Sequence, residues 1–493
     1  MNAFSRRGAC PALSAPMQTG DGLLVRLNPV AGGLSAKSLI GLGESAVRHG
    51  NGIMEVTARG SLQIRGLTAE SARFLAAEVD ALGIAVRSGV PVETGPLAGI
   101  DPQDIADPRP LAERIRVAIA EAGLTARLGP KVSVVVDGGG QLSLDAVTAD
   151  VRLKAMRCGE NVRWGVLVAG DARSAKPLAT VDADAARDIA VAALRMVAEK
   201  GRDAHTRDLS ERQLASLASW YSVTPLSVLP DISPSRGEII PSARLSPIFD
   251  LAKGEPAQEL PISPLEGEMS GRTERGAQER ESAGSPIGTF KLSNNQALGI
   301  ALPYGSMPAQ NLIDLATQAS NLGATEIRLA PGRALLFLGL TSTTCASLRA
   351  SAAALGFVNS SADPRTRIAA CPGTPACASG RIATRAMAET IATESPDLLD
   401  ASLTLHISGC AKGCAHPGTA ALTLVGDENG AGLVVDGTAK ALPAAYRPGY
   451  DAARGVAGIA AAIHDARHQG ETAAACLTRL GAAGIAELYR RNQ

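Results

Sequence analysis

The chain has 493 residues and a formal net charge of zero, because 48 Lys and Arg residues balance 48 Asp and Glu residues. Neither sign is in excess and aromatic residues make up only 3% of the chain, so nothing indicates a nucleic-acid or membrane-surface partner. No apolar run reaches about 18 residues and no apolar segment follows the basic N-terminal residues, so we expect neither a membrane span nor a signal peptide.

The first elements of the chain follow the order β-α-β-β-α. Alternating apolar residues from Gly22 predict a strand, and a stripe of apolar residues predicts the helix that follows. A glycine directly after the second helix is typical of a helix C-terminus. The elements after the first strand are a helix at 36–49, two short strands within 53–64 around a turn at 57–60, and a helix at 69–82.

A second α/β unit follows, and its elements are a helix at 111–123, a strand at 131–136, a tight loop at 137–140, a strand at 162–168 and a helix at 183–200. Residues 230–286 differ, since they contain S-P-S-R-G-E and S-P-L-E-G-E-M-S-G-R with few apolar residues. That composition predicts a disordered linker. The segment also resembles a translated mobile palindromic element of the kind found in some α-proteobacterial genomes.

The order β-α-β-β-α returns in the second half of the chain. Its elements are a strand at 298–302, a helix at 310–322, a strand pair at 326–338 and a helix at 342–355. The copies align at one offset, because 339 − 66 and 356 − 83 both give 273 for matching glycines. Such a repeat predicts two related domains about a pseudo-twofold axis. The same offset matches the loop at Asp137 with Cys410, so one half has glycines where the other has cysteines.

Four of the eight cysteines form a C-x5-C pair and a C-x3-C pair in Gly- and Pro-rich sequence: Cys371, Cys377, Cys410 and Cys414. Four thiolates close in space are what a [4Fe–4S] cluster requires. A tetrahedral zinc site and a pair of disulfides are the alternatives, although the C-x5-C spacing fits zinc poorly. Clustered reduced cysteines without an export signal favour a cytoplasmic location.

The segments beside the cysteines are predicted to be regular. Residues 378–394 are Ala-rich and lack proline, which predicts a helix whose N-terminus begins just after Cys377 and suits an anionic cluster. Residues 403–407 alternate and predict a strand that ends at the second cysteine pair. The C-terminal residues 454–493 contain helices and carry no motif that we can interpret.

Together, the repeats, the duplication and the two cysteine pairs resemble the sulfite/nitrite reductase superfamily over nearly the whole chain except the linker. Arg59, in Thr57-Ala58-Arg59-Gly60, looks like the tetrapyrrole-binding arginine of the T-x-R motif. Lys131 looks like the first lysine of the R-K-x-K motif. The resemblance assigns both residues to the catalytic site.

Two departures separate the chain from the reductases. Ser133 replaces the second lysine of R-K-x-K, and Val90-Pro91-Val92 stands where the family has Arg-Asn-Val. Losing two cations argues against sulfite or nitrite as the substrate. The segments P-L-A-G-I-D-P, P-K-V-S-V-V-V-D-G-G-G and S-G-C-A-K-G-C-A-H-P are similar instead to the precorrin-3B synthase branch of the superfamily.

Resemblance to this branch implies an oxidoreductase of aerobic cobalamin biosynthesis, a monooxygenase that hydroxylates precorrin-3A at C20 with dioxygen and forms a lactone. The electron source would be NAD(P)H or a donor protein. The tetrapyrrole carries many carboxylates, for which arginine is the natural partner. Candidate substrate-binding cations are Arg59, Arg65, Lys131, Arg367 and Lys412, followed by Arg381 and Arg385.

A second iron centre is implied as well, either sirohaem bridged by Cys414 or a non-haem iron. His406 and His416 could be ligands, or simply a strand-face and a loop histidine. The remaining cysteines, Cys10, Cys158, Cys345 and Cys476, have no partner spacing and are expected to be small apolar residues.

The expected fold is α+β, a duplicated nitrite/sulfite reductase-like fold with two ferredoxin-like half-domains and two α/β cofactor-binding domains about a pseudo-twofold axis. The expected divisions are half-domains at 18–88 and 288–358, α/β domains at 95–225 and 364–493, and the linker at 230–286. The alternative functions are an assimilatory sulfite or nitrite reductase with sirohaem and [4Fe–4S], and a nonenzymatic iron–sulfur sensor or electron carrier.

Overall fold

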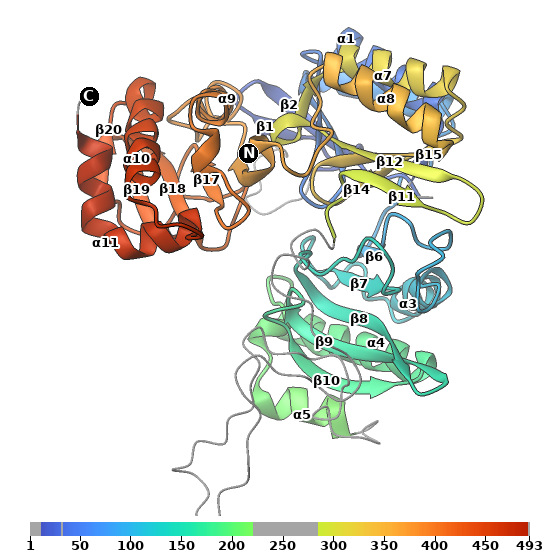
Figure 1. Ribbon diagram of the computed structural model, residues 1–493. Coiled ribbons are helices and arrows are strands. Elements are labelled where there is room, and N and C mark those ends of the chain that lie inside the picture. The colour runs from blue at the N-terminus through green and yellow to red at the C-terminus, as the bar shows by residue number, and fades with distance from the viewer. Residues whose placement is uncertain (1–10, 31–32, 220–283, 492–493) are drawn as a thin grey trace, which may run out of the picture.

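The computed structural model describes residues 11–30, 33–219 and 284–491. The predicted linker lies outside the described residues except for its last three positions. Helices and four five-stranded sheets make up the described chain, so the fold is α+β, as the sequence predicts. Figure 1 shows the sheets of the two ferredoxin-like units beneath the helices α1 (Ala36–His49), α7 (Ala309–Asn321) and α8 (Ser342–Ala354). The C-terminal domain lies on one side of these units, and the region with β7–β10 lies below them. None of the described helices has the length and apolar character needed to span a membrane.

The first ferredoxin-like unit forms an antiparallel sheet in the order β1-β2-β5-β4-β13. Its elements are β1 Met17–Thr19, β2 Gly22–Leu27, β3 Gly33–Leu34, α1 Ala36–His49, β4 Ile53–Val56, β5 Leu62–Leu67 and α2 Ala69–Ala81. Helix α2 begins with a capping box, since Thr68 and Ser71 bond reciprocally through side chain and backbone. Both predicted helices are confirmed, and their apolar stripes pack on the sheet.

The second ferredoxin-like unit repeats this arrangement in the order β11-β12-β15-β14-β3. Its elements are β11 Gly288–Lys291, β12 Gln296–Ala301, η3 Pro303–Gly305, β13 Ser306–Pro308, α7 Ala309–Asn321, β14 Glu326–Ala330, β15 Ala334–Leu340 and α8 Ser342–Ala354. Each unit lends a short strand to the sheet of the other, because β3 pairs with β14 and β13 pairs with β4. A single hydrophobic core contains residues of both units, so the repeats form one folded body.

The two remaining sheets share one topology. In the first, β6-β7-β8 run parallel and β9 and β10 follow antiparallel; in the second, β16-β17-β18 run parallel and β19 and β20 follow antiparallel. The first set is β6 Val92–Thr94, α3 Arg109–Glu121, β7 Val134–Asp137, β8 Ala149–Cys158, β9 Asn161–Gly170, β10 Lys176–Val181, α4 Ala183–Lys200, η1 Thr206–Asp208 and α5 Glu211–Ser219. The second set is η4 Pro364–Arg367, β16 Ile368–Ala370, α9 Thr384–Glu394, η5 Pro396–Leu398, β17 Leu405–Ser408, β18 Ala420–Asp427, β19 Gly430–Gly437, β20 Ala445–Arg447, η6 Gly449–Asp451, α10 Ala452–Ala466 and α11 Ala473–Arg490.

Two differences from the sequence prediction affect the segments that carry the motifs. The strand expected at 131–136 begins only at Val134, because the backbone N–H of Val132 bonds the carbonyl of Gly129 and closes a turn. Lys131 therefore lies in an exposed turn before β7. The prediction of a helix from 378 is also wrong, since α9 begins at Thr384.

The glycine-rich loop after β7 lies against an acidic turn. Asp137 accepts hydrogen bonds from the backbone of Gly139 and Leu144 at 2.9 and 2.8 Å, which fixes the loop. Next to it, Oδ2 of Asp104 is buried without a hydrogen-bond partner among the described residues. Burial, followed by the charge of Asp101, raises the pKa of Asp104 to about 6.

We predict that Asp104→Asn stabilises the protein at neutral and alkaline pH. A carboxyl whose folded pKa lies above its unfolded value costs stability once it ionises, and this cost is complete above about pH 6 and absent below about pH 4. The melting temperature of Asp104→Asn should therefore exceed that of the parent near pH 8. The two proteins should converge near pH 4.

Asp107→Asn is the matched control with the opposite sign. Hydrogen bonds from Arg109 hold the pKa of Asp107 below its usual value, so its removal should destabilise the protein at neutral pH and matter less in acid. Equal shifts for both variants across the pH range would contradict the assignment of the Asp104 environment.

Candidate functional site

The four motif cysteines lie at one edge of the C-terminal sheet. Cys371 directly follows β16, and Cys410 and Cys414 follow the neighbouring parallel strand β17. The carboxyl ends of parallel strands meet at one edge, which is where α/β folds place ligands. Burial, followed by the charges of Cys371, Cys410 and Cys377, raises the pKa of the Cys414 thiol. The other three motif thiols thus influence Cys414, and all four thiols are free.

Three glycine backbones form the floor between the cysteine loops. A Cβ atom at Gly409 would lie 3.1 Å from the Cα atoms of both Gly373 and Gly380, and 3.6 Å from Sγ of Cys371. The backbone N–H of Gly409 donates to this sulfur at 3.1 Å. Gly413, between the cysteines of the C-x3-C pair, has a positive φ of 61°, a conformation that glycine adopts without steric cost. These positions allow the loops to approach a bulky group closely.

The loop after Cys377 takes the place of the helix turn that the sequence predicts. The backbone N–H of Arg381 bonds the carbonyl of Gly409 and ties the two cysteine loops together, while that of Thr374 bonds the carbonyl of Ile382 within the first of these loops. The hydroxyl of Thr384 donates to the carbonyl of Cys371. The helix dipole consequently does not begin at Cys377, and the anion-stabilising groups near the cysteines are loop amides.

The residues present fit a multi-iron cluster better than a single ion. Among the described residues, no group of three or more His, Cys, Asp or Glu side chains lies close enough to hold one metal ion. A tetrahedral zinc site needs four ligands at about 2.0–2.3 Å from one ion, whereas each cysteine of a [4Fe–4S] cluster binds a different iron. The four free thiols and the glycine floor suit the latter.

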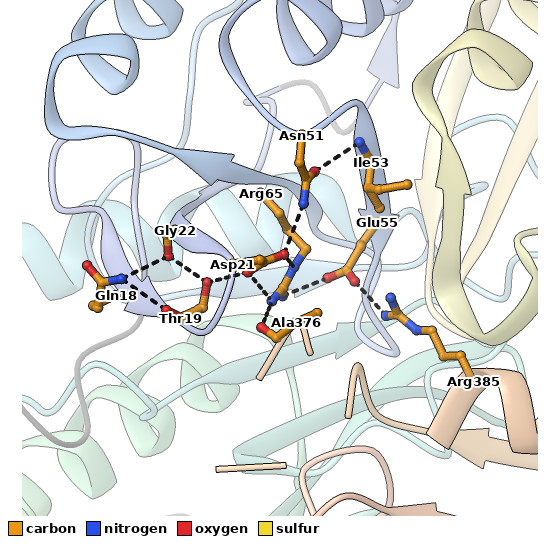
Figure 2. Close-up of polar contacts among 10 residues, drawn as sticks. All are labelled: Gln18, Thr19, Asp21, Gly22, Asn51, Ile53, Glu55, Arg65, Ala376 and Arg385. Carbon is orange, nitrogen blue, oxygen red and sulfur yellow. Dashed lines mark hydrogen bonds and ion pairs between the residues drawn. The ribbon is translucent and has the colours of Figure 1, made fainter. Parts of the chain in front are cut away.

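A buried ion-pair network ties the Cys377 loop to the first ferredoxin-like unit (Figure 2). Arg65, whose side chain is 5% exposed, donates to Asp21 at 3.0 and 2.9 Å, and its Nη1 lies 3.5 Å from Glu55. Its Nη2 also donates to the carbonyl of Ala376 at 2.6 Å. On the other side, Glu55 accepts from Arg385 of α9 at 2.5 Å.

This network changes the interpretation of Arg65. Sequence reasoning placed Arg65 among the substrate-binding cations, but protein acceptors surround its guanidinium. The backbone N–H of Gly20 bonds the same carbonyl of Ala376 at 3.2 Å, so two groups hold the residue directly before Cys377. Arg65 therefore acts on the position of the cysteine loop.

The T-x-R arginine and the altered lysine position are in direct contact. Nη2 of Arg59 donates to Oγ of Ser133 at 3.0 Å and lies 3.3 Å from Oε2 of Glu93. The Arg59 side chain is 40% exposed. Lys131 is exposed in the turn two residues before Ser133. The structure thus brings Arg59 to the segment that resembles R-K-x-K and adds the carboxylate of Glu93, which no motif in the sequence indicates.

The hairpin turns of the two repeats meet at this point. The backbone N–H of Gly332 bonds the carbonyl of Ala58 at 2.9 Å. Arg333, in the same turn, has a positive φ of 65° and donates to the carbonyl of Ala415 at 3.3 Å. Burial, followed by the charge of Arg385, lowers the pKa of Arg333. Sequence reasoning missed Arg333, although its place in the second copy of the hairpin is the signal that could have found it.

The other predicted cations lie apart from this contact. Arg367 is half-buried at the end of η4. Lys412, between Cys410 and Cys414, is exposed and donates to Oγ of Ser379 at 2.7 Å. Both lie on segments next to the cysteine loops.

His406 is fully buried on β17, and neither ring nitrogen has a hydrogen-bond partner among the described residues. His416 packs edge-on against it with ring centroids 5.7 Å apart, and Nε2 of His416 lies 3.1 Å from the carbonyl oxygen of Thr419. Burial, followed by the nearby His416, lowers the pKa of His406 to about 4. The imidazole is therefore neutral at physiological pH.

Comparison with known proteins gives consistent results. The model of the Nitrite/Sulfite reductase ferredoxin-like half domain matches residues 15–82. A precorrin-3B synthase from Sinorhizobium sp. is 38% identical over 490 residues, which cover 99% of this chain and 96% of that protein. A ferredoxin–nitrite reductase from Synechococcus elongatus is 23% identical over 82% of this chain and 76% of its own length. The structure of the Mycobacterium tuberculosis NirA protein aligns with a TM-score of 0.63 at 18% identity, covering 94% of this chain and 84% of that one.

We predict that Ser substitution at each of the four motif cysteines removes or degrades a cluster, because each thiolate holds its own iron. Iron and acid-labile sulfide should be measured on anaerobically purified protein, together with the broad visible absorption. Cys158→Ser is the control and should retain full iron and sulfide. Full cluster content in all four single variants would show that the cluster lies elsewhere.

We predict that Arg65→Met loosens the Cys377 loop and lowers cluster retention. Removing Arg65 takes the cationic partner from Asp21, while Glu55 keeps Arg385. Loss of one partner of a buried ion pair costs about 3–5 kcal/mol. The measurement is the rate of iron release to a chelator, with the thermal transition recorded alongside. Arg73→Gln, an exposed arginine on α2, is the matched control. Iron release from Arg65→Met at the parental rate would contradict the positioning role.

Proposed function

The chain belongs to the precorrin-3B synthase family, and from that premise we propose that it hydroxylates precorrin-3A at C20 with dioxygen and forms the lactone, as a monooxygenase of aerobic cobalamin biosynthesis. The observation that carries the proposal is the contact of Arg59 with Ser133 and Glu93. A serine and a carboxylate stand where an anion-reducing site needs cations.

This contact argues against sulfite or nitrite reduction. A small anion gains its transition-state stabilisation from preorganised donors and positive charge. Here Arg59 is shared with the carboxylate of Glu93, which would repel an incoming anion. Ser133 supplies only a neutral hydroxyl, and its oxygen already accepts from Arg59. The site therefore offers less net positive charge than the motif of the reductases.

A large polycarboxylated ring places other demands on the same residues. Arg59 and Lys131 remain our candidates for contact with substrate at the reacting face, and Arg367 and Lys412 are candidates from the side of the cysteine loops. Arg65 is excluded from this set because its guanidinium is buried among protein acceptors. Many-point binding tolerates the loss of one lysine, since each cation contributes only a part of the affinity.

The cysteines at 371, 377, 410 and 414 would hold the [4Fe–4S] cluster, which supplies single electrons when bound. NAD(P)H or an electron-donor protein in the cytoplasm would provide these electrons. For the second iron centre, the described residues offer no three-ligand site for a mononuclear iron. His406 and His416, whose rings are in contact near the second cysteine pair, are the candidate imidazole ligands there.

We predict that the reduced protein consumes precorrin-3A with dioxygen and reduces sulfite and nitrite poorly. Two missing charge-assisted contacts, each about 2–4 kcal/mol, would slow anion reduction about a thousandfold or more. The measurement is a side-by-side assay with a strong artificial reductant. Rapid sulfite reduction without an oxygen-dependent change in the precorrin spectrum would favour the reductase alternative.

A further inference from the structure

A cavity of about 530 Å³ lies where the two ferredoxin-like units meet the first α/β domain. Its volume is in the range of small-molecule sites. Its described lining contains one carboxylate, Glu93, and five guanidinium groups, those of Arg59, Arg87, Arg109, Arg116 and Arg328. Such an excess of one charge inside a concave site attracts ligands of the opposite charge.

Most of these arginines already have protein partners. Arg59 donates to Ser133 and lies beside Glu93, as described above. Three more of the five pair with carboxylates that are not part of the cavity lining: Arg109 with Asp107, Arg116 with Glu113 and Arg328 with Glu326. These ion pairs hold the three arginine side chains in position, and their guanidinium groups line the cavity.

Arg87 is the exception. Its Nε donates to the carbonyl of Pro29 at 3.1 Å, but no described carboxylate lies within ion-pair distance of its terminal nitrogens. Burial lowers the pKa of Arg87, with Arg116 adding to this effect and Glu93 opposing it. The terminal nitrogens of Arg87 bond no described residue, so an anion that entered this cavity of like charges could pair with them.

We propose that this arginine cavity binds peripheral carboxylates of the tetrapyrrole substrate, and that one of these carboxylates forms an ion pair with Arg87. This inference rests on the function proposed above. The cavity and the reacting face share Arg59, so a ring held against Arg59 and Lys131 can extend a carboxylate-bearing edge toward Arg87. The fork geometry of guanidinium matches a carboxylate bidentately, and the cavity is sized for an edge of the ring and its acid side chains.

The test uses uroporphyrin, a porphyrin with eight carboxylates, in equilibrium dialysis against the cluster-loaded protein. Arg87→Gln should weaken binding about tenfold or more, since a charge-assisted pair is lost. Arg87→Lys keeps the charge but loses the two-pronged guanidinium geometry, so its affinity for uroporphyrin should lie between those of the parent and Arg87→Gln. Arg73→Gln on α2 should bind as the parent does. Coproporphyrin, with four carboxylates, should bind more weakly and depend less on Arg87.

Pyrophosphate and NADPH form a second arm that separates carboxylate from phosphate as the source of the anion. Arg87-dependent binding of these phosphates, without any dependence for uroporphyrin, would overturn the proposal. Unchanged uroporphyrin binding by folded Arg87→Gln or Arg87→Lys would overturn it as well. Failure of the proposed function is distinguishable, because a protein inactive on precorrin-3A can still bind uroporphyrin through Arg87, and an active one can bind it independently of Arg87.

Discussion

The position of the cysteine loops depends on one buried cation. Arg65 comes from a strand of the first ferredoxin-like unit and contacts the backbone directly before Cys377, which is more than three hundred residues away in the chain. Its charge is balanced by Asp21 and by Glu55, which in turn holds Arg385 at the start of α9. Because a buried charge without a partner is expensive, this arrangement has one favourable geometry, and it fixes the cysteine loop against the first unit.

Duplication explains why such a contact is possible. Both ferredoxin-like units contribute to one core and exchange the strands β3 and β13, so their hairpin turns meet at a common point. Each unit is followed by an α/β sheet of the same topology. In the first sheet the strand β7 ends in a carboxylate that fixes a glycine loop, whereas in the second the loop after β17 carries two cysteines. The same position in the two sheets thus carries a loop held by hydrogen bonds in one and a cysteine loop in the other.

The sequence predicted the parts of this structure that depend on local pattern. The helices Ala36–His49 and Ala69–Ala81 follow from their apolar stripes and end signals. The exchanged strands could not be predicted, since two or three residues show no periodicity. The start of α9 was missed because backbone contacts between distant loops override a helix-favouring composition. Arg65 and Arg87 look alike in the sequence, and only the structure shows that Arg65 is paired with two carboxylates whereas Arg87 has no ion pair to a described carboxylate.

The partners of an arginine also decide how much positive charge it offers to a bound anion. Arg59 serves both the T-x-R hairpin and the wall of the arginine cavity, and Glu93 draws part of its charge away from the reacting face. A small anion bound only at that face would therefore meet a weakened field. In the proposed binding mode, a ring with many carboxylates recovers this loss by also contacting Arg87. In the proposed binding mode, Ser133 lacks the positive charge of a lysine at the reacting face while the arginines of the cavity keep theirs, and this difference favours a large acid over a small one.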